Sequence, residues 1–336
     1  MVKFSQYLVL PRGLLVFSFV DAAFMSLIWV VEAPYLKVLG FTPLEYGILG
    51  SVMALSTLIS LSVTGWLTDK LRAIPLVILS ITIRTLGLIL LATGVKWVIY
   101  VSACIMGLSS SLLWIPFEVL VSRVVEKEKY HYAYPYIHAL TQIGNAIGAY
   151  SGWIPELTSK LYGVSILELY RYTILLSAFT TLLLIPLLKK VREKYSIPRK
   201  VEASKGLTSI LKGILGSVWK TIGKLALSQV LIGLGASISI HNISYYFILK
   251  YGVGSGGLGT LFGSENLVMA LLMLLLPRIS EKLVGSLKTD VVLSSTSIPL
   301  LIALTLVNNY YLAITIFITR TVLMNVAHPL FTAFTM

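Results

Sequence analysis

Four of the ionisable side chains inside long apolar stretches of the sequence are candidates for chemistry, because a charge there needs a partner or a chemical role. They are Asp21, Arg84, Glu118 and Arg320. A charge at the centre of a membrane helix costs about 2.5–3.5 kcal/mol on insertion scales. A carboxyl group such as Asp21 offsets that cost by pairing or by exchanging a proton, and an arginine does so by binding an anion or a carboxylate. These residue types predict proton or anion chemistry or, as the structural alternative, buried ion pairs.

Helices that cross a membrane are the elements that would hold these side chains. Hydrophobic residues make up 57% of the 336 residues and charged residues only 12%, about half the share of a soluble domain. A bilayer core requires about 20 apolar residues per helix, and the strand alternation of a membrane barrel is absent. We therefore predict an all-α polytopic membrane protein. The ten expected spans are 13–32, 45–65, 74–94, 98–122, 132–154, 169–188, 225–249, 259–279, 289–307 and 311–332.

Basic residues are distributed unevenly between the two sides of these spans. With the N-terminus in the cytoplasm, 20 of the 27 Lys and Arg fall on the cytoplasmic side, five on the other side and two within spans. Such a bias predicts a multi-pass protein of the plasma membrane with a cytoplasmic N-terminus. The formal charge of +13 then reflects orientation in a lipid bilayer, and we expect no nucleic acid as a partner. We expect the protein to be a monomer.

A long basic stretch at 189–224 divides the chain. It separates an N-terminal six-helix half at 1–188 from a C-terminal half at 225–336, in which four helices are present. Between Lys205 and Lys220, apolar residues recur at helical spacing. This spacing predicts a basic amphipathic helix on the cytoplasmic membrane surface, with a solvated linker as the alternative.

The two halves share a short pattern. A shift of 212 residues places Glu281 and Lys282 on Asp69 and Lys70. Parallel repeats of this kind predict two homologous halves. Because a complete second half would extend well beyond residue 336, we expect a C-terminal truncation, and a genuine ten-helix protein is the alternative.

Short motifs of the first half resemble a known family. Residues 34–36 (Pro-Tyr-Leu) and the pattern Gly65-x-Leu-x-Asp69-Lys70 are similar to the opening of major facilitator superfamily transporters. That family carries a Gly-x-x-x-Asp-Arg/Lys signature between helices 2 and 3. The match is partial, because Arg72 occupies the position of the second glycine. The resemblance implies a pseudo-twofold helical bundle with ten of its twelve transmembrane helices present.

The resemblance also implies roles for particular residues. The charged pairs after helices 2 and 8 would act as a conformational latch between the halves, with a plain surface turn as the alternative; these residues are Gly65, Asp69, Lys70, Glu281 and Lys282. In this fold helices 1, 4, 7 and 10 line a central cavity. Asp21 and Glu118 are then candidates for proton coupling. The candidates for the substrate cavity are Arg320, Trp114, Asn242, Tyr245, Tyr246 and Asn325.

Helix 5 carries a stripe of small residues and a polar face. Glycines at every fourth position favour close helix packing, plausible at the seam between the halves; they are Gly144, Gly148 and Gly152. His138, Gln142 and Asn145 recur on one side of the same helix. A histidine there can titrate near neutral pH, and a hydrogen-bonding role is the alternative.

The family resemblance implies a secondary active transporter that works by alternating access on a small-molecule substrate. It needs no cofactor beyond a proton or other ion gradient. Proton-coupled efflux of drug-like or metabolite molecules is the first hypothesis, and proton-coupled uptake of a sugar or organic anion, with Arg320 as the anion ligand, is the alternative. A transporter-fold membrane sensor or assembly partner is a hypothesis from another class. The spacing of histidine, cysteine and serine predicts neither a metal site nor an enzyme active site.

Overall fold

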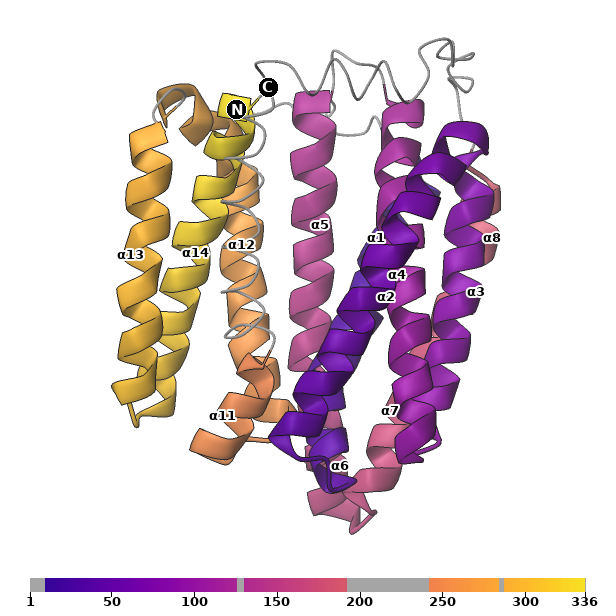
Figure 1. The fold of residues 1–336 in the computed structure, drawn as a ribbon, viewed down its shortest axis with the longest axis vertical. Coiled ribbons are helices and arrows are strands. Elements are labelled where there is room, and N and C mark those ends of the chain that lie inside the picture. The colour runs from indigo at the N-terminus through magenta and orange to yellow at the C-terminus, as the bar shows by residue number, and fades with distance from the viewer. Residues whose placement is uncertain (1–9, 126–129, 192–241, 284–286, 336) are drawn as a thin grey trace.

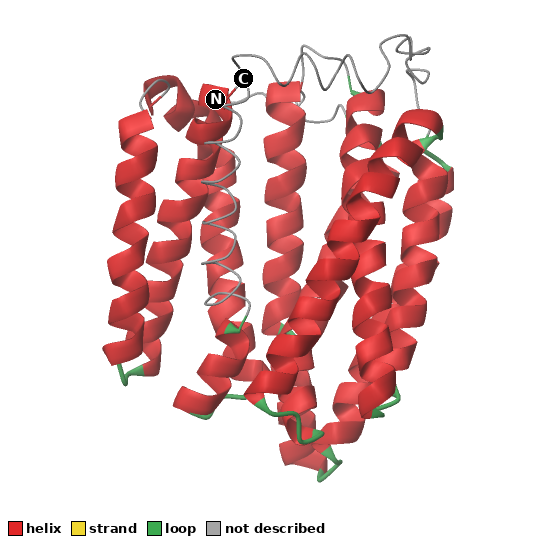
Figure 2. Cartoon of the chain, viewed as in Figure 1, coloured by secondary structure: helices red, strands yellow, loops and turns green. Residues whose placement is uncertain are grey.

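The computed structural model describes residues 10–125, 130–191, 242–283 and 287–335 of the chain. At 62, 130–132, 135, 274–283, 287–294 and 325–335 it describes the backbone but not the side chains. All regular structure in the described residues is helical, and the long helices stand side by side in one bundle (Figures 1 and 2). The predicted all-α fold is thereby confirmed.

The described part of the first half contains eight helices. They are α1 (Arg12–Val38), α2 (Pro43–Lys70), α3 (Ala73–Ala92), α4 (Lys96–Val124), α5 (Tyr130–Tyr150), α6 (Trp153–Tyr162), α7 (Ile166–Leu183) and α8 (Ile185–Lys189). Within the described residues, five stretches are long and apolar enough to cross a membrane: α1, α2, α3, α4 and the combined α7 and α8.

The described part of the second half contains four helices. They are α11 (Ile243–Tyr251), α12 (Ser255–Leu283), α13 (Leu287–Leu306) and α14 (Tyr310–Thr335). Of the expected span at 225–249 only the part in α11 is described, and the expected amphipathic helix between Lys205 and Lys220 lies outside the described residues. In Figure 1, α12 stands between α5 of the first half and the pair α13–α14.

The bundle has two distinct ends. At one end α1 begins and α14 ends, and α2 and α4 finish with Lys70 and Arg123 in their last turns (Figure 1). We call this the basic end. At the opposite end, here called the loop end, α1 is joined to α2 and the short helix α6 follows α5. The antiparallel run of neighbouring helices between these ends follows from the short connections in the sequence.

Local sequence fixes the start of α2 at the loop end. The Thr42 hydroxyl accepts a hydrogen bond from the Glu45 backbone N–H at 3.2 Å, and the Glu45 carboxylate accepts one from the Thr42 N–H at 2.8 Å. This capping box satisfies two backbone donors, and Pro43 fits the first helical position. Lys96 at the start of α4 forms an ion pair with Glu45 at 2.8 Å, so the α1–α2 turn is tied to α4.

The connection between the expected spans 45–65 and 74–94 is shorter than the sequence suggested. Helix α2 continues through Gly65 and ends at Lys70, which leaves only Leu71 and Arg72 outside helices. The helix is extended because its last carbonyl groups find a donor. The Arg123 guanidinium, from α4, donates to the Thr68 carbonyl at 3.2 Å and to the Leu71 carbonyl at 3.4 Å. Such cationic capping of a helix C-terminus is favourable.

Two other expected spans are divided. The span at 132–154 ends at Tyr150, and α6 follows as a separate helix. The span at 169–188 is interrupted at Leu184, because Pro186 lacks an N–H and cannot continue the hydrogen-bond pattern of α7.

The glycines of α5 bring this helix close to its neighbours. A Cβ atom at Gly144 or Gly148 would overlap the carbonyl groups of Phe19 or Ala23 of α1. These two glycines therefore serve packing inside the first half. Gly152 lies instead against the Ser255 carbonyl of α12, which is at the seam between the halves.

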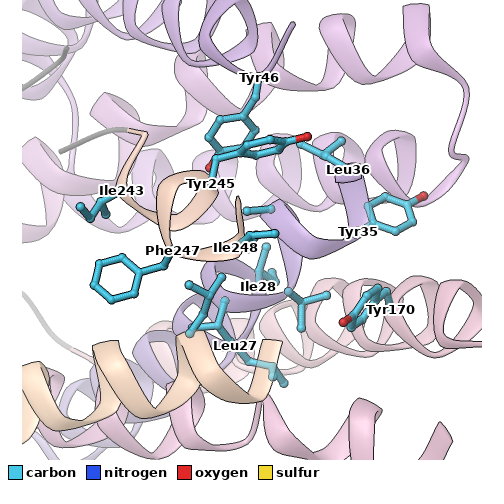
Figure 3. Packing of buried hydrophobic residues seen from close by; sticks show 14 of the residues in the cluster. Leu27, Ile28, Tyr35, Leu36, Tyr46, Tyr170, Ile243, Tyr245, Phe247 and Ile248 are labelled. Atoms are coloured by element: carbon cyan, nitrogen blue, oxygen red, sulfur yellow. The ribbon is translucent and has the colours of Figure 1, made fainter. Parts of the chain in front are cut away.

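A hydrophobic cluster at the loop end joins the two halves. Figure 3 shows Leu27, Ile28, Tyr35 and Leu36 of α1 beside residues of α11. From α11 the cluster receives Tyr245, Phe247 and Ile248, all less than 5% exposed, together with Ile243. Burial of apolar surface at this end stabilises the contact between the halves.

Candidate functional site

A cavity of about 770 Å³ lies between the two halves at the centre of the bundle. Its volume is in the range of sites for small organic ligands. Side chains of α1 to α5 form one wall, and α11, α12 and α14 form the other. The ionisable side chains that line it are Asp21, Arg84, His138, Glu265 and Arg320.

Two of these charges neutralise each other. The Asp21 carboxylate forms an ion pair with the Arg84 guanidinium, and a second hydrogen bond between them measures 3.2 Å. Both residues are less than 10% exposed. The structural alternative for Asp21, a buried ion pair, is therefore present in the fold, and its partner is Arg84.

Glu118 lies beside His138, outside the cavity lining. The His138 Nε2 atom is 3.6 Å from a carboxylate oxygen of Glu118. His138 itself faces the cavity together with Gln142 and Asn145, as the spacing along helix 5 predicted. The Asn145 amide donates to the Gln142 side-chain oxygen at 2.9 Å, so this polar face is ordered.

The second half contributes a carboxyl group and a guanidinium group that do not pair. Arg320 of α14 and Glu265 of α12 both line the cavity, yet among the described residues no ion pair joins either of them to another side chain. The buried Nε atom of Arg320 has no hydrogen-bond acceptor. We did not select Glu265 from the sequence, although it stands inside the expected span 259–279 and could have been found by the criterion that selected Asp21.

The other cavity candidates are distributed over several places. Trp114 lines the central cavity. Asn242 lines a second cavity instead, and Tyr245 and Tyr246 line neither of the two, so the structure does not place these three residues at the wall of the central cavity. The side chain of Asn325 lies outside the described residues.

The hydroxyl groups of the two tyrosines donate to backbone carbonyl groups, because α11 lies at the loop end. The Tyr246 hydroxyl donates to the Leu304 carbonyl of α13 at 2.9 Å, within the second half. The Tyr245 hydroxyl donates to the Phe41 carbonyl, and its ring packs on Tyr46 with centroids 4.9 Å apart. Tyr245 thus belongs to the contact between the halves.

The second cavity has a volume of about 560 Å³ and lies toward the loop end. It shares Met25, Trp29, Met53 and Met106 with the central cavity, so the two spaces adjoin. Among the described residues that line it, Glu32 is the one acidic side chain, and no sequence pattern pointed to it.

Hydrogen bonds between described residues of the two halves gather at the loop end. The Glu156 carboxylate of α6 accepts from the Gly256 backbone N–H at 2.9 Å and from the Ser255 hydroxyl at 3.3 Å. Trp153 donates to Thr260 at 3.1 Å. Together with the Tyr245 bond, these contacts hold the halves together at the loop end.

The expected latch at the basic end has a different arrangement. Asp69 and Lys70 are exposed, and Lys70 lies 4.0 Å from the ring of Trp66 on its own helix. No hydrogen bond or ion pair joins Asp69 to the described part of the second half. Glu281 and Lys282 fall in the last turn of α12, where side chains are not described.

Replacement of Glu156 by glutamine is expected to weaken the closure of the loop end. The carboxylate faces the first N–H groups of α12, where a negative charge is worth about 0.3–1 kcal/mol. Glutamine keeps an oxygen acceptor but loses the charge, so the population with the loop end open should rise about two- to fivefold. Double electron–electron resonance measures that population. It gives the distances between spin labels at the exposed positions Tyr162 and Tyr311 in a cysteine-free background.

Glu168→Gln is the matched control, because Glu168 is an exposed acid in the first turn of α7. It should leave the distance distribution unchanged. Equal distributions for the Glu156 and Glu168 variants would contradict a closing role for Glu156.

The fold and its central cavity between two halves define a class of protein, the membrane transporters with a two-half helical bundle. The family model of the Major Facilitator Superfamily matches residues 14–336. The chain belongs to this superfamily and is therefore a transporter rather than an enzyme. No curated protein sequence matches it significantly.

Solved structures of transporters share the fold at low sequence identity. A mutant of the nucleoside transporter NupG gives a TM-score of 0.72 at 15% identity over 94% of this chain and 79% of that one. The human organic anion transporter MFSD10 (TETRAN) gives 0.62 at 15% identity over 96% and 86%. A D-xylose-proton symporter gives 0.53 at 13% identity over 96% and 80%. At these identities the likeness shows the fold alone.

Proposed function

We propose that this transporter moves a small organic anion across the plasma membrane by alternating access, driven by protons. This is the uptake alternative of the sequence analysis. The observation that carries it is Arg320, a guanidinium that lines the central cavity and, among the described residues, has no ion pair. A planar fork of donors in a site of low dielectric constant favours a carboxylate ligand.

The direction of transport follows from orientation and charge. We place the basic end in the cytoplasm by the positive-inside rule. An anion that travels with a proton moves inward under an inward proton gradient. The contacts of Tyr245 and Glu156 at the loop end support a state that faces away from the outside.

The pairing of Asp21 with Arg84 favours a positioning role for Asp21, since a free coupling carboxyl would not share its charge with a buried guanidinium. Glu118 stays a candidate proton site, because it lies 3.6 Å from His138 at the edge of the cavity.

Efflux of lipophilic molecules is the second candidate function. It is favoured by the aromatic and sulfur-containing side chains of the cavity wall, which can adapt to apolar ligands. These side chains are Met25, Trp29, Met53, Met106, Trp114, Phe117, Phe262, Met273 and Phe317.

Proteoliposomes distinguish these functions. We expect an inward proton gradient to drive accumulation of radiolabelled hippurate or glucuronate above the level in protein-free liposomes, and a protonophore to abolish it. Proton-driven movement of ethidium without movement of either carboxylate would favour efflux. No movement of any of these solutes would contradict proton-driven anion transport and favour a sensor.

A further inference from the structure

The arginines of the central cavity differ in how far the protein satisfies them. Arg84 is paired with Asp21. Both arginines have a buried Nε atom without an acceptor, but in the part of the chain that the structure describes no hydrogen bond or ion pair joins the Arg320 guanidinium to another residue. Arg320 is half-buried and lines the cavity, so a ligand in the cavity can supply the counter-charge that the described residues do not. Two parallel hydrogen bonds from its fork match the two oxygens of one carboxylate group.

A carboxyl group shares the corner of the cavity that holds this arginine. Glu265 lines the cavity together with Thr321 and lies beyond ion-pair distance of Arg320, close enough for the two charges to interact. Thr321 follows Arg320 in α14 and is only 7% exposed. A ligand carboxylate at Arg320 would therefore add a second negative charge near Glu265. Two carboxylates in one site of low dielectric constant do not both stay ionised.

We propose that Arg320 and Glu265 together bind one carboxylate group and one proton. This inference rests on the proposed function and adds the residue that carries the proton. The ligand carboxylate accepts hydrogen bonds from Arg320, and a proton from water forms the O–H bond of Glu265. The net charge of Arg320, Glu265 and the ligand is then the same with and without ligand. The site can therefore change the side to which it opens at a similar electrostatic cost in both forms.

The other ionisable groups around the cavity have contacts of their own. Asp21 of α1 holds Arg84 of α3, and His138 of α5 lies beside Glu118 of α4. The described residues of α2 and α11 contribute no ionisable side chain to the lining. His138 is thus the competing proton acceptor that the experiment has to separate from Glu265.

Calorimetric titration of the detergent-solubilised chain with benzoate tests this site. Titrations in two buffers of different ionisation enthalpy give both the affinity and the number of protons taken up. We expect saturable binding with about one proton taken up per benzoate, because one added negative charge is compensated by one proton. Benzamide, a neutral analogue of the same shape, should not compete.

Variants identify the residue that takes up the proton when benzoate binds. Glu265→Gln should still bind benzoate, because an amide resembles a protonated carboxyl group, but its proton uptake should fall to nearly zero. Glu168→Gln, far from the cavity, should behave as wild type. Proton uptake that persists in Glu265→Gln, or that is lost in His138→Gln instead, overturns the proposal.

Two further outcomes separate this site from the proposed function. Absence of saturable binding of both benzoate and phenylacetate to the wild-type chain overturns the site, even if proteoliposomes carry another solute. Benzoate binding with proton uptake but without flux in proteoliposomes supports the site and removes the transport function.

Discussion

Replacement of Arg84 by methionine is expected to destabilise the protein by about 3–5 kcal/mol, because it leaves the buried Asp21 carboxylate without its counter-charge. Both side chains lie within the first half, between α1 and α3, and both are less than 10% exposed. Methionine is apolar and flexible and fits the space of the arginine stem, so loss of packing is a minor part of the effect. The free energy of unfolding in a denaturant titration of mixed micelles measures the change.

The double variant with Asp21→Asn and Arg84→Met tests the cause. Removal of both charges from a buried pair is often nearly neutral, so the double variant should recover most of the lost stability. Arg72→Met is the matched control at an exposed arginine and should change the stability by less than about 0.5 kcal/mol. If the Arg84→Met variant is as stable as the Arg72→Met control, the ion pair does not stabilise the protein.

Replacement of Arg320 by glutamine is expected to reduce proton-driven carboxylate uptake into proteoliposomes by at least about 30-fold. Loss of one partner of a desolvated, charge-assisted contact costs about 2–5 kcal/mol, and each 1.4 kcal/mol is a factor of ten in affinity. Arg320→Lys should be intermediate, because an ammonium group keeps the charge but loses the two-pronged geometry. Initial rates of glucuronate or hippurate uptake measure the effect.

The control for this experiment is Arg12→Gln, since Arg12 is exposed at the basic end of α1. Its uptake should equal that of the wild type. If Arg320→Gln keeps wild-type rates while thermal unfolding shows that it is folded, then Arg320 is not an anion ligand, and the efflux candidate becomes the better account of the cavity.

Several properties of this protein could be predicted from the sequence because they depend on local composition. The length and apolarity of the runs determine that the chain forms membrane helices, since an unpaired backbone in lipid is too costly. Ion pairing could also be anticipated as an alternative, because a charge such as Asp21 or Arg84 inside an apolar run needs compensation. The helical spacing of His138, Gln142 and Asn145 correctly predicted a shared face.

The tertiary structure alone decided which charged side chains pair and where along the bundle each side chain lies. Spacing along the chain gives no information on which arginine lies opposite Asp21, because α3 and α14 both carry one inside their apolar runs. Tyr245 and Tyr246 were expected in the cavity, but the short helix α11 places them at the loop end. The end of α2 likewise depends on Arg123 of α4, which supplies donors to its last carbonyl groups.

The same division applies to the proposed anion site. The sequence alone identified Arg320 as a charge that needs a partner. Only the packing of α12 beside α14 showed that Glu265 lies near it without an ion pair, in a cavity of about 770 Å³. The physical reason is that hydrophobic periodicity determines which segments are helices, whereas the choice of which charges meet depends on long-range contacts between helices that no local pattern records.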